Sequence, residues 1–245
     1  MEDPPAPGPR DFVTTQWSWV LAAGPDEASR THARKALEKL CRAYWYPLYA
    51  FVRHSGHSAD EAQDLTQAFF TRIIETHGLA SADPERGRFR SYLLGAMKHF
   101  LANEWHRERA KKRGGGVSLL ELDALDPEAR YALETAPPTD PSAGFDREWA
   151  LEIIARAMEK LRSESEARGK AELFEGLKPS LTGAEPARNE TAARLGMTAG
   201  AVKVAVHRLR QRYRELLRAE IAETVKDPFD IDAEMRHLLA ALREG

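Results

Sequence analysis

Residues 189–208 read NETAARLGMTAGAVKVAVHR and have the pattern of two short helices joined by a tight turn. Gly196 permits the turn because glycine adopts a positive φ without steric cost, and Thr198 is a favoured N-cap for the helix that follows. This spacing is typical of a helix-turn-helix. The alternative interpretation is a solvated amphipathic hairpin that binds nothing.

The side chains of this segment divide into an inner and an outer set. Small Ala192 and Ala193 would let the two helices cross closely, while Leu195, Val202 and Val206 would fill the crevice between them. A helix about 10 to 12 Å across fits the DNA major groove, so we expect the outer face of the second helix to enter it. The residues expected to contact DNA are Thr198, Lys203, His207, Arg208 and Arg210.

The 245-residue chain has a net charge of −2, but its charges are unevenly distributed. Residues 86–113 hold nine Lys/Arg against two Glu, and residues 188–218 hold eight against two, while the remainder of the chain is acidic. Two cationic segments on an acidic chain indicate contact with a polyanion at two separate places.

The composition also excludes several classes of protein. The single cysteine, Cys41, cannot form an internal disulfide or a zinc finger, and no run approaches the ~20 apolar residues of a membrane span. Phosphate-binding loops and the motifs of zinc proteases and serine hydrolases are absent from the sequence. We therefore expect a cytoplasmic protein that is not an enzyme and has no catalytic residue, no metal site, no cofactor and no membrane partner.

Helical periodicity dominates the sequence, and no segment alternates as a strand does, so the predicted fold class is all-α with two small helical domains. The predicted helices include 31–55, 58–76, 89–112, 146–166 and 230–243. The predicted units are a helical bundle at 12–113, a flexible acidic linker at 114–145, the helix-turn-helix domain at 146–225, and a C-terminal helical extension at 226–245. We expect the extension to pack on the second domain; the alternatives are that it inhibits the protein or recruits a partner.

The helix expected from residue 89 interleaves basic and aromatic side chains. Its rings would stack on unpaired bases while its cations follow phosphates, which is how single strands are commonly held. The alternative is that the aromatic residues are ordinary core residues. The residues concerned are Tyr92, His99, Phe100, Trp105 and His106.

Three segments together resemble sigma factors of the extracytoplasmic-function (ECF) group. They are SADEAQDLTQAFF at 58–70, GRFRSYLLGAMKHFLANE at 87–104 and GAVKVAVHRLR at 200–210. The resemblance covers about residues 14–224. This chain departs from the family pattern at two positions, because relatives commonly have Asn where His99 stands and Asp where Asn103 stands.

The resemblance implies a sigma region 2-like bundle that binds the clamp coiled coil of core RNA polymerase and melts the minus-ten promoter element. It implies a sigma region 4-like domain that binds the polymerase flap and reads the minus-thirty-five element through Lys203, His207 and Arg208. The implied polymerase-binding residues are Asp64, Gln67 and Phe70. The implied minus-ten contacts are Arg88, Arg90, Lys98, His99, Asn103, His106 and Arg107.

The functional hypothesis is therefore a sigma factor that directs core RNA polymerase to specific promoters. The two promoter elements lie about 70 Å apart, and this distance exceeds the relaxed span of the linker. The linker would therefore be held stretched, and its negative charge would suit a basic channel of the polymerase. An anti-sigma factor or a regulatory kinase would be a further partner. The alternative is an autonomous helix-turn-helix regulator that binds DNA without polymerase; a nuclease or recombinase would need clustered carboxylates.

Overall fold

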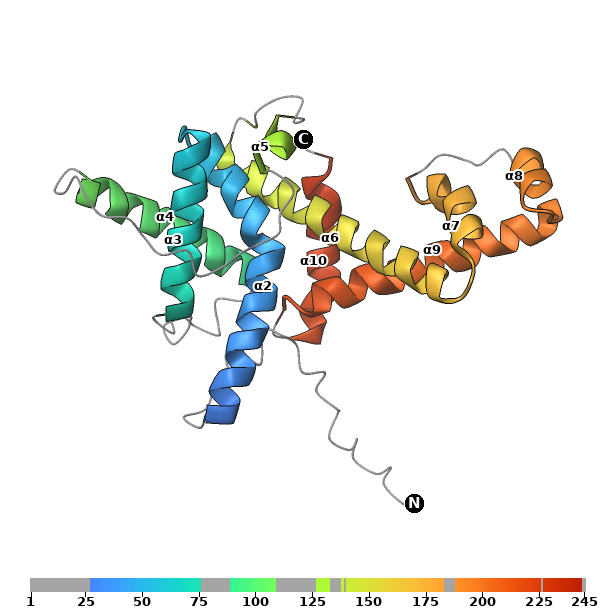
Figure 1. The fold of residues 1–245 in the computed structure, drawn as a ribbon, viewed down its shortest axis with the longest axis horizontal. Coiled ribbons are helices and arrows are strands. Elements are labelled where there is room, and N and C mark those ends of the chain that lie inside the picture. Colours follow the sequence, from blue (N-terminus) through green and yellow to red (C-terminus); the bar gives the residue numbers. More distant parts are fainter. Residues whose placement is uncertain are drawn as a thin grey trace, which may run out of the picture.

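The structure is a computed structural model that describes residues 27–75, 89–108, 127–132, 138, 140–182, 188–225 and 227–243. These residues form helices and turns with no β-strand among them, which confirms the all-α prediction (Figure 1). The helices are α2 (Glu27–His54), α3 (Ala59–Glu75), α4 (Phe89–Glu108), α5 (Pro127–Tyr131), α6 (Pro141–Ala167), α7 (Ala171–Leu177), η2 (Lys178–Thr182), α8 (Arg188–Arg194), α9 (Ala199–Ala222), η3 (Pro228–Asp230) and α10 (Ile231–Ala241).

Helix α2 is the centre of an N-terminal bundle. Its C-terminal half is buried on every side: Tyr44 and Leu48 share one face, while Trp45 and Tyr49 share another, and all four are buried. A helix that is apolar all round must be covered by neighbours on several faces. Helices α3, α4, α5 and α6 provide that cover, and Phe70 of α3 joins the same core.

The N-terminal half of α6, which includes residues on both sides of the predicted boundary at 146, packs in this bundle as well. Phe145, Trp149 and Ile153 are buried in the core of the bundle. The indole N–H of Trp149 donates a hydrogen bond of 3.1 Å to the hydroxyl of Tyr44. The helix begins at Pro141, five residues before the predicted start at 146, because the Asp140 side chain caps it by accepting from the Ser142 amide at 2.9 Å.

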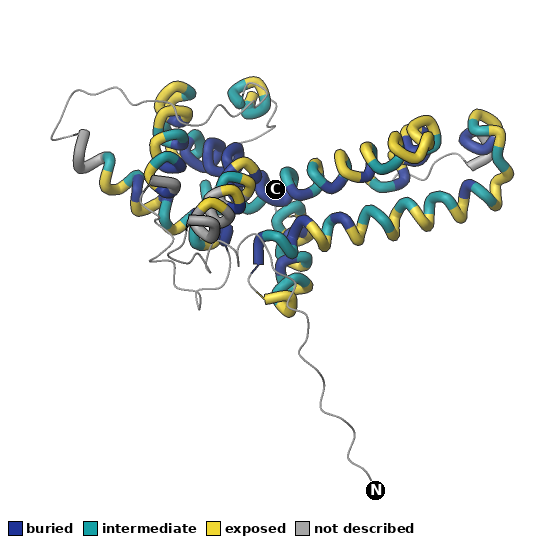
Figure 2. Tube along the Cα trace, turned by 60° about the horizontal axis from the view of Figure 1, so that its bottom comes forward, coloured by how far each residue is buried: buried dark blue, intermediate teal, exposed yellow. Residues whose placement is uncertain are grey.

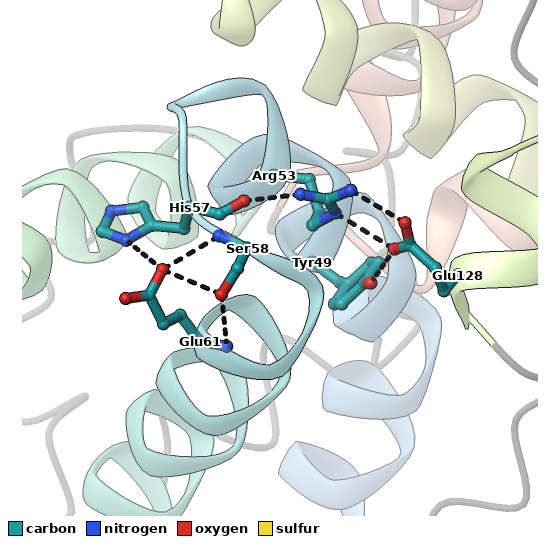
Figure 3. A network of polar contacts seen from close by, with 6 residues as sticks. All are labelled: Tyr49, Arg53, His57, Ser58, Glu61 and Glu128. Atoms are coloured by element: carbon teal, nitrogen blue, oxygen red, sulfur yellow. Dashed lines mark hydrogen bonds and ion pairs between the residues drawn. The ribbon is translucent and has the colours of Figure 1, made fainter.

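The described part of the predicted linker at residues 127–132 lies against the bundle. Arg53 donates to the Glu128 carboxylate at 2.8 and 3.0 Å, and the Tyr49 hydroxyl donates to it at 2.5 Å (Figure 3). The hydrogen bonds from Arg53 and Tyr49 lower the pKa of Glu128 below its ordinary value. Arg130 lies 3.7 Å from the ring centroid of Tyr46, a cation–π distance.

Ser58 caps α3. The Ser58 amide donates to the Glu61 carboxylate at 2.9 Å, and the Glu61 amide donates to the Ser58 hydroxyl at 3.4 Å (Figure 3). This reciprocal capping box satisfies two amides that the first turn of a helix leaves without partners. It fixes the point at which the chain turns from α2 into α3.

A two-helix arm extends from the bundle, formed by the second half of α6 and by α9 (Figure 1). Ala157, Leu161 and Leu216 form its small core with Phe174 of α7. Buried residues concentrate in the bundle and on the inner sides of the arm, while the outer sides are exposed (Figure 2). The C-terminal end of α9 returns to the bundle, where Ile221 is fully buried. The arm and the bundle therefore share two continuous helices.

The C-terminal helix α10 lies at the joint between arm and bundle. It contacts both α6 and α9, and Leu238 is buried in the core that the bundle helices build. The expectation that this extension packs on the second domain is therefore incomplete. Helix α10 also contacts the bundle through an ion pair between Glu234 and Arg90 of α4.

Gly144 marks the closest approach between α6 and its surroundings. A Cβ at this position would lie 2.6 Å from Cγ of Pro138, which is closer than real Cβ atoms come to a neighbour, and 3.0 Å from Nδ1 of His54, which is a tight contact. We expect Gly144→Ala to destabilise the protein by about 1 to 3 kcal/mol through overpacking, measured by urea denaturation. The control is Gly95→Ala in α4, where an added Cβ meets nothing within 4 Å and helix propensity favours alanine. Equal effects of the two substitutions would contradict this packing.

Candidate nucleic-acid interfaces

The helix-turn-helix is held in shape by its turn. Gly196 has a φ of +61°, the left-handed conformation that glycine adopts at no cost. The Met197 amide donates to the Ala192 carbonyl at 2.9 Å, which closes the end of α8. The Thr198 hydroxyl then accepts from the Ala201 amide at 3.2 Å and caps α9. The turn and the cap appear where the sequence predicted them.

The crevice between α8 and α9 is filled only in part by the predicted residues, because Ala193 is exposed and Leu195 is half-buried outside the cluster. Val202 and Ala192 are buried with Leu177 of α7, and Val206 packs against this cluster. Close packing of this kind gives two helices one fixed crossing geometry. The opposite face of α9 is thereby directed away from the protein.

That opposite face presents a row of exposed residues. Lys203, His207 and Arg208 are exposed, as is Thr198 at the start of the helix. Val204 lies in the same row and is 49% exposed, although a valine usually avoids water. Val204 is not among the residues predicted from the sequence to contact DNA, although its spacing of three to four residues from His207 and Arg208 places it on their face.

Arg210 is exposed, and its side chain also makes a contact within the protein. Its guanidinium donates two hydrogen bonds of 2.9 and 3.1 Å to the carbonyl of Ser180, a buried residue of η2. Arg210 therefore fastens α9 to η2. Arg212 is likewise occupied, since it donates to Glu164 of α6 at 2.6 and 2.9 Å. In the part of the chain that the structure describes, no ion pair involves Lys203 or Arg208.

The second candidate interface lies along α4. Its exposed positions recur at Ser91, Gly95, Lys98 to His99, and Ala102 to Asn103, which forms one stripe along the helix. His99 and Asn103 are therefore neighbours one turn apart. Lys98 lies beside them and donates to the Ser142 hydroxyl at 2.8 Å.

Three of the residues predicted for this interface lie outside what the structure describes. Arg88 precedes the described part of α4. His106 and Arg107 belong to its last turns, where the helix is described but the side chains are not. Their proposed contacts with DNA stay predictions.

Arg90 departs from the prediction of a DNA contact because its side chain is buried. Its Nη1 donates to Asp146 at 2.6 Å, and its Nε donates to Glu234 at 3.1 Å. Burial opposes the charge, but these hydrogen bonds and charges raise the pKa of Arg90 above its ordinary value. In this conformation the guanidinium cannot reach a DNA strand.

Helix α3 carries the predicted polymerase contacts. Asp64 is exposed on a stripe that also includes Asp60, and Gln67 is half-buried beside it. Phe70 is fully buried and lies 5.5 Å, centroid to centroid, from Phe69. The structure therefore places Phe70 in the core, where it holds α3 against α2, and not on the surface that a partner would touch.

Other chemistry finds little support in the described residues. No group of three or more His, Cys, Asp or Glu among them is arranged to hold a metal ion. Cys41 is buried, and this burial raises the pKa of its thiol, which disfavours the reactive thiolate. In the helices that the structure describes, none is both long and apolar enough to cross a membrane.

The different roles of Arg208 and Arg210 can be separated by experiment. Arg210→Ala removes two hydrogen bonds that join α9 to η2, so we expect it to lower the free energy of unfolding by about 1 kcal/mol. Arg208→Ala removes an exposed side chain and should change stability by less than about 0.5 kcal/mol. Urea denaturation of both variants measures this difference, and equal destabilisation would contradict the assignment.

Comparison with models of known protein families matches residues 28–219 to the family described as ECF sigma factor. The matched region includes the described parts of α3, α4 and the helix-turn-helix, and it ends before α10. Searches of curated proteins and of solved structures gave no match.

Proposed function

The chain belongs to the ECF sigma factor family, and from that premise we propose that it directs core RNA polymerase to specific promoters. In this proposal the helix-turn-helix reads the minus-thirty-five element, and α4 captures the minus-ten element as a single strand. The polymerase performs the chemistry, while this chain supplies recognition.

The exposed row on α9 carries the proposal. Lys203 and Arg208 supply cations for phosphates or guanine edges, and His207 supplies a hydrogen-bonding ring. Val204 offers an apolar surface of the kind that contacts the methyl group of thymine. A row with both polar and apolar elements suits base recognition better than a merely solvated face would.

The exposed stripe on α4 supports the second contact. The His99 ring can stack on an unpaired base, and the Asn103 amide one turn away can donate to and accept from a base edge. Lys98 lies next to both, where a cation can follow the phosphates. The three side chains together suit an extruded strand.

We place the polymerase contacts on the exposed acidic stripe of α3 and on the helix-turn-helix domain, for the clamp coiled coil and the flap respectively. Asp60 and Asp64 are exposed there. A stretched path for the acidic linker through a polymerase channel requires α5 to leave α2, which breaks the Glu128 contacts with Arg53 and Tyr49. An anti-sigma factor or a kinase that controls this step is part of the proposal.

Dependence on polymerase tests the proposal directly. Mapping of transcript starts made by core RNA polymerase, with and without this protein, should show new start sites that appear only with both. The protein alone should shift duplex promoter DNA weakly, and core polymerase should strengthen the shift. Tight binding without polymerase, and no effect on start sites, would favour the autonomous regulator instead.

The role of Val204 can be tested at single positions of the minus-thirty-five element. Replacing a contacted thymine by uracil, as a deoxyuridine nucleotide, removes only the methyl group. This should weaken binding about fourfold for the wild-type complex with polymerase. Val204→Ala should bind more weakly and should lose this sensitivity to uracil. Leu239→Ala, another large hydrophobic residue that is 48% exposed, is the matched control and should retain it. Retained sensitivity in Val204→Ala would remove this residue from base reading.

A further inference from the structure

A buried cluster of charges joins α4, α6 and α10. The Arg90 side chain is only 9% exposed and the Glu234 side chain only 2%, and Asp146 of α6 completes the cluster. The guanidinium carbon of Arg90 also lies 5.2 Å from the centre of the Trp149 ring. The cluster thus lies where the bundle, the arm and the C-terminal extension meet.

Stability alone is a weak reason for such a cluster. The free energy lost when charges are removed from water offsets much of the free energy gained from their attraction. An apolar contact of the same size often stabilises a protein equally. The more informative fact is where the partners come from. Arg90 lies in the first turn of the helix proposed to hold the minus-ten strand, and Glu234 lies in α10, beyond the residues matched to the family.

The two carboxylates accept hydrogen bonds from Arg90 in the way that a DNA phosphate would. A guanidinium binds carboxylate and phosphate through the same planar set of donors, so one can replace the other without a change of protonation. Glu234 and Asp146 thus occupy the donors that a phosphate would need.

Helix α10 has further contacts that hold it in this place. Leu238 is buried in the bundle core one turn after Glu234, and Asp232 pairs with Arg218 of α9. His237 lies 3.2 Å from Asp146. Helix α10 therefore contacts the bundle and both helices of the arm. Its release would remove contacts from the bundle, α6 and α9 together.

We propose that α10 is an intramolecular clasp, which occupies Arg90 through Glu234 in the free protein and opens when polymerase and promoter bind. Opening exposes Arg90, which then pairs with a phosphate of the minus-ten strand. This inference rests on the proposed function. It makes the C-terminal extension an inhibitor of promoter binding by the free chain.

Two variants of different chemistry test the clasp in the full-length protein. Glu234→Gln removes the charge that α10 contributes to Arg90 and leaves Asp146 of α6 in place, and Leu238→Ala removes the apolar anchor of α10 without changing any charge. We expect each to increase open-complex formation at limiting protein by about threefold or more, because the cost of opening has been removed. The matched controls are Glu159→Gln, an exposed glutamate of α6, and Leu239→Ala, the exposed neighbour of Leu238; both should behave as wild type.

A double variant identifies Arg90 as the group that is released. Leu238→Ala combined with Arg90→Gln opens the clasp but lacks the cation, so the gain should disappear. Amide hydrogen exchange should also show that α10 loses protection when core polymerase and promoter are added to the wild-type protein. Thermal unfolding of every variant sets an assay temperature at which all are folded.

The outcomes separate the clasp from the proposed function. Wild-type protein that supports no polymerase-dependent transcription would overturn the proposed function and the clasp with it. Normal wild-type transcription, with no gain in Glu234→Gln and Leu238→Ala, would overturn the clasp alone. A loss of transcription in proportion to lost thermal stability would show that α10 only packs, and would also overturn it.

Discussion

The packing of the first half of α6 against α2 is the contact on which the remaining architecture depends. Trp149 is 1% exposed, and a buried indole N–H without an acceptor would be costly, so its hydrogen bond to the Tyr44 hydroxyl fixes the rotation of α6 on the bundle. Because α6 continues without a break to Ala167, this rotation also sets the direction of the arm. The helix-turn-helix at the end of the arm is positioned by a contact made at the other end.

Some of the basic residues form contacts within the protein and others remain available to a partner, and a count of charges does not show this division. Of the cations in the two basic segments, Arg90, Arg210, Arg212 and Arg218 are engaged with partners inside the protein. These contacts join α4 to α10, α9 to η2, α9 to α6 and α9 to α10. The electrostatic attraction for DNA therefore depends mainly on the remaining cations, while the internal contacts of Arg210, Arg212 and Arg218 hold α9 against its neighbours.

The helix-turn-helix could be predicted from the sequence because it depends on local signals: a glycine at the turn, a threonine cap and apolar residues at helical spacing. The start of α4 at Phe89 and the capping of α3 were predictable for the same reason. Contacts between residues far apart in the chain could not be predicted in this way. Arg90 meets Glu234 across 144 positions and Arg210 meets Ser180 across 30, and periodicity contains no information on such pairs. A basic residue in a basic segment was therefore interpreted as a DNA contact.

Helix α9 connects the proposed DNA-recognition face with the joint between arm and bundle, because both lie on one continuous helix. Its first turns carry Lys203 and His207, and its last turn places Ile221 in the bundle core. A helix of 24 residues is about 36 Å long and bends little, so a rearrangement at the joint moves the recognition face as a unit. A flexible linker would lose this coupling, since each end could move alone. Helix α10 contacts α6 and α9 near the bundle. Because these two helices continue into the arm, a movement of α10 can shift the helix-turn-helix without contacting it.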